Sequence, residues 1–117
     1  RVSAANFYDQ GFKEIAQMSI PKREKKSTHV FHQYTLKLNG VNRSKFQVFL
    51  LENNIPSMIY YPVPVHRQKA FLGAKDSLRE FPVTDKLCKE VISLPMHTEL
   101  DHEQLEYIVK TIKNYLN

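Results

Sequence analysis

Hydrophobic residues recur at helical spacing near both ends of the chain. At the amino-terminal end, apolar residues three or four positions apart predict an amphipathic helix over residues 2–16, which Gly11 weakens locally. Near the carboxyl end, Asp101 and Gln104 form a capping-box signature at the start of a last helix. The predicted apolar stripe of that helix consists of Leu105, Ile108, Val109, Ile112 and Leu116. Each helix is therefore expected to bury one face.

A strict alternation of side chains predicts the clearest strand, over residues 29–38. Its apolar face consists of Val30, His32, Tyr34, Leu36 and Leu38. Asn39 and Gly40 end the strand with turn chemistry. A lone histidine on such a face is more often a hydrogen-bonded core residue than a ligand, so His32 is expected to be buried.

The middle of the chain alternates between further helices and strands. Asn42 is placed to cap a helix over residues 43–53. The apolar and aromatic side chains of residues 57–61 favour a strand. Pro62 and Pro64 stop this strand, because proline cannot donate a hydrogen bond to a strand ladder.

Two more elements complete the pattern before the last helix. Residues 73–79 are expected to form an irregular connection, and Thr84 is expected to cap a short helix that follows it. Residues 91–94 then form a short apolar strand, which Pro95 ends.

This order of elements predicts an α+β fold. A small sheet of about three strands is expected, with helices covering one face. Crossover helices favour parallel strands, whereas short segments also pair antiparallel, so the strand direction stays open. The 117 residues are expected to form a single domain over residues 1–117.

Composition and charge indicate the location of the protein and exclude some kinds of partner. The chain has no apolar run of the roughly 20 residues that a membrane-spanning helix needs, and no signal-peptide core, so no membrane association is expected. Its single cysteine, Cys88, cannot form an internal disulfide, which favours a reducing, cytoplasmic location. The net charge of +5 is densest over residues 22–26. No helix or interleaved aromatic residue accompanies that run, so it is interpreted as a solvated loop and no nucleic-acid partner is expected.

Several kinds of catalytic site are not expected. The five histidines include no pair with the i, i+4 spacing of a helical metal site, and one cysteine provides no zinc set. The three glycines do not cluster, so they cannot form a phosphate-binding loop.

One stretch is a candidate binding site. Five polar side chains fall within nine residues, at the end of the strand predicted over residues 57–61 and directly after it: Tyr60, Tyr61, His66, Arg67 and Gln68. Polar groups on a loop that a rigid scaffold holds are typical of a binding site. The alternative is that they simply face water.

Several stretches, taken in order, resemble one family. They are HVFHQY (29–34), YYPVPVHRQ (60–68), FPVT (81–84), EVISLPMH (90–97) and residues 101–109. The succession closely resembles the carboxyl-terminal small domain of the DegT/DnrJ/StrS sugar aminotransferases. These are pyridoxal 5'-phosphate-dependent enzymes of the aspartate-aminotransferase fold type. The resemblance implies that residues 1–16 form a connecting helix and residues 27–117 the small carboxyl-terminal domain.

The resemblance also implies which residues serve the intact enzyme. His66 would be an auxiliary catalytic residue, and the substrate-binding residues would be His32, Tyr34, Tyr60, Tyr61, Arg67 and Gln68. The missing large domain would hold pyridoxal 5'-phosphate and supply the lysine that binds it covalently. No cofactor-binding residue and no metal ligand is therefore expected in this chain, which alone would be inactive.

The implied reaction is amination of a nucleotide-linked keto sugar, with glutamate as amino donor and a homodimer as the intact enzyme. The Tyr-Tyr-Pro, Pro-Val-His and Arg-Gln motifs resemble most the enzymes that act on UDP-linked 3-keto sugars for surface polysaccharides. The alternative hypothesis is a non-catalytic module that binds an anionic partner through residues 22–26 and 60–68.

Overall fold

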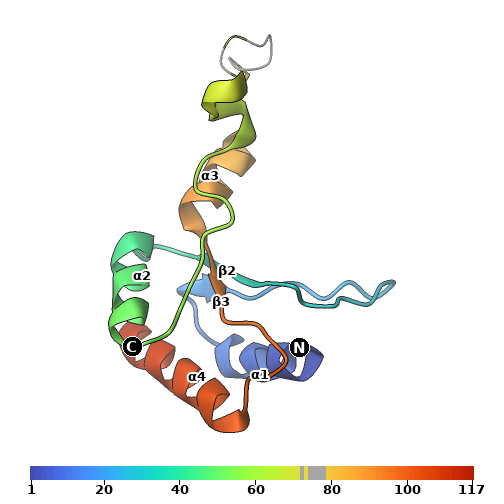
Figure 1. The fold of residues 1–117 in the computed structure, drawn as a ribbon, viewed down its shortest axis with the longest axis vertical. Helices are drawn as coiled ribbons and strands as arrows, with labels where there is room; N and C mark the ends of the chain where they lie inside the picture. Colours follow the sequence, from blue (N-terminus) through green and yellow to red (C-terminus); the bar gives the residue numbers. More distant parts are fainter. Residues whose placement is uncertain (72, 74–78) are drawn as a thin grey trace.

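A three-stranded antiparallel sheet organises the chain (Figure 1). The computed structural model describes residues 1–71, 73 and 79–117. The strands are β1 (Met18–Ser19), β2 (Tyr34–Leu38) and β3 (Val91–Leu94), in the order β1-β2-β3. β2 is therefore the central strand, and both of its neighbours run antiparallel to it.

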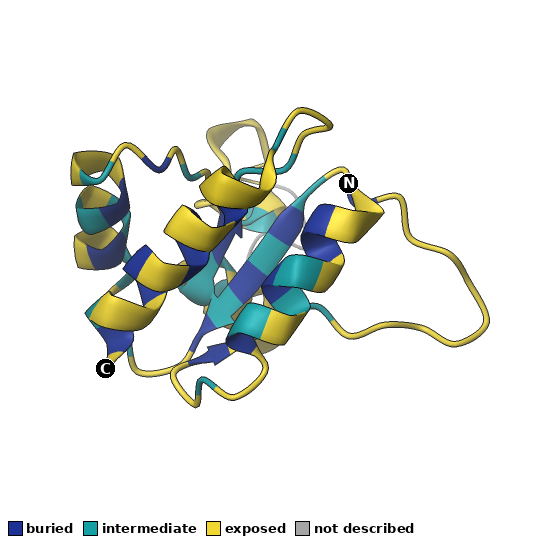
Figure 2. Ribbon diagram, turned by 90° about the horizontal axis from the view of Figure 1, so that it is seen from below, coloured by how far each residue is buried: buried dark blue, intermediate teal, exposed yellow. Residues whose placement is uncertain are grey.

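Four α-helices accompany the sheet: α1 (Val2–Phe12), α2 (Arg43–Glu52), α3 (Pro82–Glu90) and α4 (His102–Leu116). α1 and α4 lie side by side across one face of the sheet, with buried residues toward it and exposed residues outward (Figure 2). α2 lies beside α4, whereas α3 extends away from the sheet as a column (Figure 1). The α+β fold expected from the sequence is confirmed.

The core joins the two ends of the chain to the central strand. Its fully buried side chains include Tyr8, Phe12, Tyr34, Leu36, Phe46, Ile92 and Ile112. All five residues of the predicted α4 stripe are buried, and burial of each such side chain contributes about 1.5–3 kcal/mol. The capping box is also present, because Asp101 Oδ1 accepts from the Gln104 amide at 2.8 Å and Gln104 Oε1 accepts from the Asp101 amide at 3.1 Å. Asn42 caps α2 as predicted.

The predicted strand over residues 29–38 is only half present. Its carboxyl-terminal part, β2, has the predicted buried face. Phe31 has a φ of 48°, in the left-handed region, and this interrupts the extended backbone ahead of β2. The interruption changes the alternation, so Phe31 is buried while Val30 and His32 are exposed. The expectation that His32 is a buried core residue was therefore wrong.

The strand predicted over residues 57–61 is absent. Met58 exchanges two backbone hydrogen bonds with Ser93, at 2.7 and 3.1 Å, but this bridge is isolated. The side chains that suggested a strand are largely exposed here, since no layer covers them. The third strand is instead β1, whose two residues are too few to leave a periodic pattern.

Two helix boundaries also differ from the sequence prediction. The first helix ends at Phe12 rather than near residue 16. Thr84 lies inside α3 and does not cap it, because the helix already begins at Pro82, where the missing N–H leaves no donor unsatisfied. The connection predicted over residues 73–79 lies largely outside the described residues, which include Gly73 and Arg79 but not 74–78.

Gly11 permits the close approach of α1 and α4. A Cβ atom at this position would lie 2.7 Å from Val109 Cγ1 and 3.0 Å from Val109 Cγ2. Both distances are too short for carbon atoms that are not bonded to each other, so this helix pair requires the absence of a side chain.

Gly11→Ala is expected to destabilise the protein by about 1–3 kcal/mol through overpacking, although alanine favours a helix more than glycine does. Urea denaturation measures the change. In a Val109→Ala background, which removes both Cγ atoms, the same substitution should be neutral or stabilising. A Gly11→Ala protein as stable as the wild type would contradict the close approach.

The buried hydroxyl groups of Tyr8 and Tyr34 make the free energy of unfolding depend on pH in the alkaline range. The Tyr8 hydroxyl donates to the Pro95 carbonyl at 3.1 Å, and the Tyr34 hydroxyl donates to Asp9 Oδ1 at 2.7 Å. Burial raises the pKa of both tyrosines well above the ordinary value, and the hydrogen bond to Asp9 raises that of Tyr34 further. A raised folded-state pKa means that the neutral phenol stabilises the fold below the unfolded pKa.

The free energy of unfolding should therefore fall as pH rises above about 10, where the unfolded tyrosines ionise and the folded ones do not. Each tyrosine contributes a slope of about 1.4 kcal/mol per pH unit in that range. Tyr34→Phe removes one of the two protons, so its slope should be shallower by that amount in urea titrations between pH 10 and 11. Equal slopes in the two proteins would show that Tyr34 ionises normally in the fold.

Candidate functional site

The candidate loop is shaped by its two prolines. Pro64 has extended backbone angles (φ −60°, ψ 144°) and precedes a single 3₁₀ turn, Val65–Arg67. The Arg67 amide donates to the Pro64 carbonyl at 2.9 Å, and the Gln68 amide donates to the Val65 carbonyl at 3.0 Å. This short turn places the side chains of His66 and Arg67 beside the start of α3.

Asp85 is the residue that joins this loop to α3. Its two carboxylate oxygens lie 3.5 Å from His66 Nε2 and 2.7 Å from Arg67 Nη2. Asp85 lies in the first turn of α3, where the helix dipole favours a negative charge. Sequence reasoning did not single out Asp85, and an acidic residue at a helix start is too common a signal to identify it.

His66 is largely covered by its neighbours. Its side chain is 12% exposed, and its ring lies 4.8 Å from that of Phe81. The Arg67 side chain is 62% exposed, while its Nη2 pairs with Asp85 and its Nε donates to His66 Nε2 at 3.4 Å. The loop therefore combines a fixed imidazole with an accessible cationic fork.

The other predicted residues of this stretch surround the loop less closely. Tyr60 and Tyr61 are exposed, and their rings pack edge to face with centroids 5.7 Å apart. Gln68 is exposed at the end of the 3₁₀ turn. A small pocket beside the loop is lined by Pro62, Pro64, Arg67, Asp85, Cys88 and Lys89.

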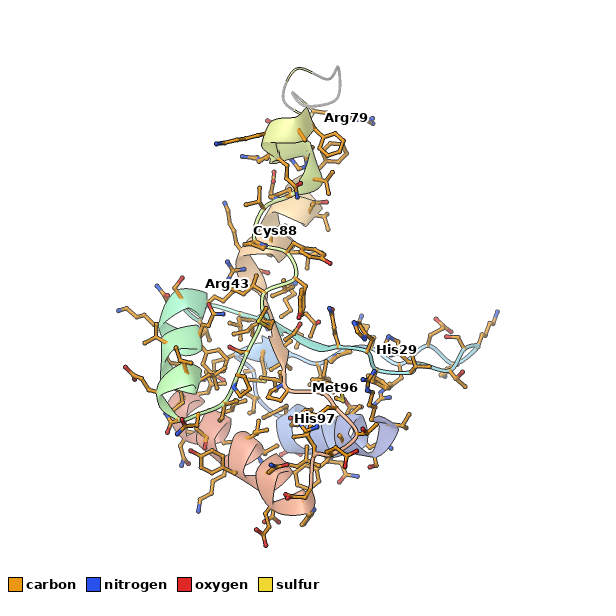
Figure 3. The ribbon with its side chains drawn as sticks, viewed as in Figure 1. His29, Arg43, Arg79, Cys88, Met96 and His97 are labelled. Carbon is orange, nitrogen blue, oxygen red and sulfur yellow. The ribbon has the colours of Figure 1, made fainter. Side chains whose placement is uncertain are left out.

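A side chain of α2 contacts the carboxyl-terminal end of α3. Arg43 extends toward Cys88, at the carboxyl-terminal end of α3 (Figure 3). Its Nη1 donates to the Cys88 carbonyl and lies 3.5 Å from the Val91 carbonyl. These carbonyls have no helical partner, so the guanidinium caps the helix end and fixes where the column leaves the sheet.

His32 and Tyr34 are placed differently from each other. His32 is exposed and lines a pocket of about 310 Å³ with His29, Phe31, Gln33 and others. Tyr34 is fully buried and its hydroxyl is bonded to Asp9. Of the two, only His32 is exposed and lines a pocket. A pocket of about 440 Å³ between Ile55 and α4 is lined by none of the predicted site residues.

The described residues do not fit a covalently bound pyridoxal 5'-phosphate. The lysine that binds this cofactor must lie in an enclosed site, where loss of solvent lowers its pKa. Every lysine in the described ranges is exposed except Lys37, whose side chain is still 40% exposed and whose Nζ lies 3.9 Å from Glu90. No reaction step is therefore assigned to the cofactor within this chain.

Two other features are absent from the described residues 1–71, 73 and 79–117. No group of three or more histidine, cysteine, aspartate or glutamate side chains in this part of the chain is arranged to hold a metal ion. None of its helices has the length and apolar character needed to cross a lipid bilayer.

Curated proteins similar to this chain include several sugar aminotransferases. A UDP-N-acetyl-3-dehydro-alpha-D-glucosamine 3-aminotransferase of Acidithiobacillus ferrooxidans is 36% identical over 117 residues, which is 100% of this chain and 30% of that protein. A UDP-2-acetamido-2-deoxy-3-oxo-D-glucuronate aminotransferase of Pseudomonas aeruginosa is 32% identical over 97% of this chain and 30% of its own length. A pleiotropic regulatory protein of Geobacillus stearothermophilus is 42% identical over 81% of this chain. The chain thus spans about a quarter to a third of the relatives it matches.

Solved structures agree with the fold. The structure of a DegT DnrJ EryC1 StrS aminotransferase from Brucella abortus superposes with a TM-score of 0.85 at 25% identity, covering 99% of this chain and 30% of that one. That of S. venezuelae DesV in complex with a ketimine intermediate gives a TM-score of 0.90 at 22% identity, over 99% of this chain and 31% of that one. The profile of the DegT/DnrJ/EryC1/StrS aminotransferase family matches residues 1–113. With that match over nearly its whole length, this chain belongs to the DegT/DnrJ/EryC1/StrS aminotransferase family.

Proposed function

We propose that the intact protein transfers an amino group to a nucleotide-linked keto sugar and that this chain forms its small carboxyl-terminal domain. The observation that carries the proposal is the family match over residues 1–113, with relatives named as nucleotide-sugar aminotransferases that are three to four times longer. On this proposal residues 1–16 connect the small domain to a large domain. That domain would hold pyridoxal 5'-phosphate, and solved relatives in the PMP form support this cofactor.

The substrate proposed is a UDP-linked 3-keto sugar for surface polysaccharides, with glutamate as amino donor and a cytoplasmic homodimer as the enzyme. The two relatives named for UDP-linked 3-oxo or 3-dehydro sugars support the nucleotide and the position. A relative of Aneurinibacillus thermoaerophilus, 31% identical, is named for a dTDP-linked sugar, so the nucleotide is the part of the proposal to test first.

Within this chain, the His66 loop provides the groups suited to such a substrate. Arg67 has five N–H donors and its side chain is 62% exposed, so the donors that do not contact Asp85 or His66 suit a diphosphate oxygen. Tyr60 and Tyr61 offer exposed ring faces and hydroxyls. His66 is held by Asp85 and Phe81, which fixes its ring for a hydrogen bond or a proton exchange at its nitrogens.

A second candidate function is a non-catalytic module that binds an anionic partner. The relative named as a pleiotropic regulatory protein and the exposed basic run over residues 22–26 favour it.

The two candidate functions differ in whether the protein turns over a nucleotide sugar. The full-length protein, supplied with pyridoxal 5'-phosphate, glutamate and either a UDP-linked or a dTDP-linked 3-keto sugar, should release 2-oxoglutarate with the UDP sugar. Binding of the sugar nucleotide without any turnover would favour the regulatory module.

His66→Ala in the full-length protein is expected to keep the fold and lower turnover by about 10²-fold if the imidazole moves a proton. His66→Asn separates the roles, because its amide donates a hydrogen bond but cannot titrate. A binding role predicts that the asparagine variant recovers most activity, and a proton-transfer role predicts that it does not. Steady-state kinetics and melting temperature provide the measurement.

The exposed His97, on a different loop, is the matched control: His97→Ala should leave turnover unchanged. Near-normal turnover and substrate affinity in both His66 variants would remove this residue from the site.

A further inference from the structure

Three segments that are distant in the sequence meet at the carboxylate of Asp9. Its Oδ1 accepts the Tyr34 hydroxyl at 2.7 Å, and its Oδ2 accepts Arg23 Nε at 2.9 Å and Arg23 Nη2 at 2.6 Å. Arg23 Nη2 also donates to Asn6 Oδ1 at 3.1 Å. Arg23, from the basic run over residues 22–26, is thereby bound to α1 beside the start of β2.

The same guanidinium covers Phe31. Arg23 Cζ lies 4.1 Å from the centre of the Phe31 ring, a cation–π distance. Phe31 is 1% exposed and has a left-handed φ of 48°, a conformation that is rare for a bulky side chain and that its surroundings therefore have to stabilise. The Arg23 plane is one of the surfaces that close over this ring, so it helps to impose that conformation.

Phe31 in turn fixes His29. The Phe31 amide donates to His29 Nδ1 at 2.9 Å, and the two rings lie 4.3 Å apart. Because Nδ1 accepts a hydrogen bond, the neutral imidazole carries its proton on Nε2. His29 and His32 both line the pocket of about 310 Å³, so the backbone at Phe31 sets where two imidazoles face the pocket.

We infer that the ion pair between Asp9 and Arg23, called the latch below, positions His29 and His32 at this pocket. The pair is a positioning device rather than a source of global stability. The Arg23 side chain is 37% exposed and that of Asp9 is 22% exposed, and ion pairs with this much solvent contribute little to the free energy of unfolding. The Arg23 guanidinium is planar, so it hydrogen-bonds to Asp9 and covers the Phe31 ring at the same time. The pair therefore fixes the local geometry.

The imidazoles of His29 and His32 and the amide of Gln33 can donate hydrogen bonds in this pocket, which suits an oxygen-rich anion; under the function proposed above that anion belongs to the sugar nucleotide. Only this assignment of the ligand rests on the proposed function. The effect of the latch on Phe31 and His29 is a property of the chain itself and can be measured without a substrate.

The test uses the full-length protein with ¹⁵N-labelled histidine and the variants Arg23→Ala and Arg23→Lys. Lysine retains the charge but neither the fork nor the flat face. Lys25→Ala removes one charge from the same exposed run and is the matched control. Imidazole ¹⁵N spectra report the His29 tautomer, hydrogen exchange reports the Phe31 amide, and the melting temperature reports global stability.

Both Arg23 variants should lose the fixed Nε2–H tautomer of His29 and exchange the Phe31 amide about tenfold faster or more, with melting close to that of the wild type. Lys25→Ala should change neither signal. A fixed tautomer and slow exchange in Arg23→Lys would overturn the latch. So would a rise in exchange that is equal throughout the chain, because it would indicate a general stabilising role.

Steady-state kinetics test separately whether the pocket binds the sugar nucleotide. Arg23→Lys should raise the KM for the sugar nucleotide about tenfold with kcat nearly unchanged, the signature of lost binding in the ground state and transition state alike. An unchanged KM beside a released His29 would overturn the assignment of the pocket to the substrate. If the wild-type protein turns over no nucleotide sugar, the proposed function fails, while the tautomer and exchange measurements still decide whether the latch exists.

Discussion

The packing of α1 against α4 over one face of the sheet is the constraint on which the rest of the structure depends. It brings the first and last helices together, buries the largest aromatic side chains and requires glycine at position 11, where Val109 leaves no room for a side chain. The Gln17 side chain adds to it by donating to the Leu116 carbonyl at 2.9 Å. This body is the rigid scaffold from which both loops with candidate polar groups project.

Polar contacts hold both polar loops, and the segment before β2 also has Phe31 in the core. α3 has no buried residue among those described, so the His66 loop depends on polar contacts: Asp85 at the start of the helix and Arg43 at its end. On the other side, the approach to β2 depends on Asp9 and Arg23. In both places one carboxylate on a helix collects two basic or hydroxyl donors. Local geometry can therefore be changed by single substitutions that leave the core intact.

Family membership and site geometry support different parts of the functional proposal. The match over residues 1–113 establishes the family, while the described lysines are too exposed to hold its cofactor. Under the proposed function, the residues that this chain contributes would bind and position an anionic, hydroxyl-rich substrate. A small domain that orients a substrate beside chemistry supplied by another domain is consistent with both observations.

The sequence by itself determined the elements whose signals are local. The cap of α2, the capping box and stripe of α4, and the apolar face of β2 each arise within a few residues, so periodicity and capping chemistry were sufficient. The ordered motifs also identified the family. Tertiary structure decided what depends on partners distant in the chain. The backbone at Phe31 reverses the exposure of His32, and β1 exists only because β2 is beside it. Met58, Tyr60 and Tyr61 remain exposed, although their residue types favour a strand. Asp85 became part of the site through the tertiary structure, since only folding brings its carboxylate to His66 and Arg67.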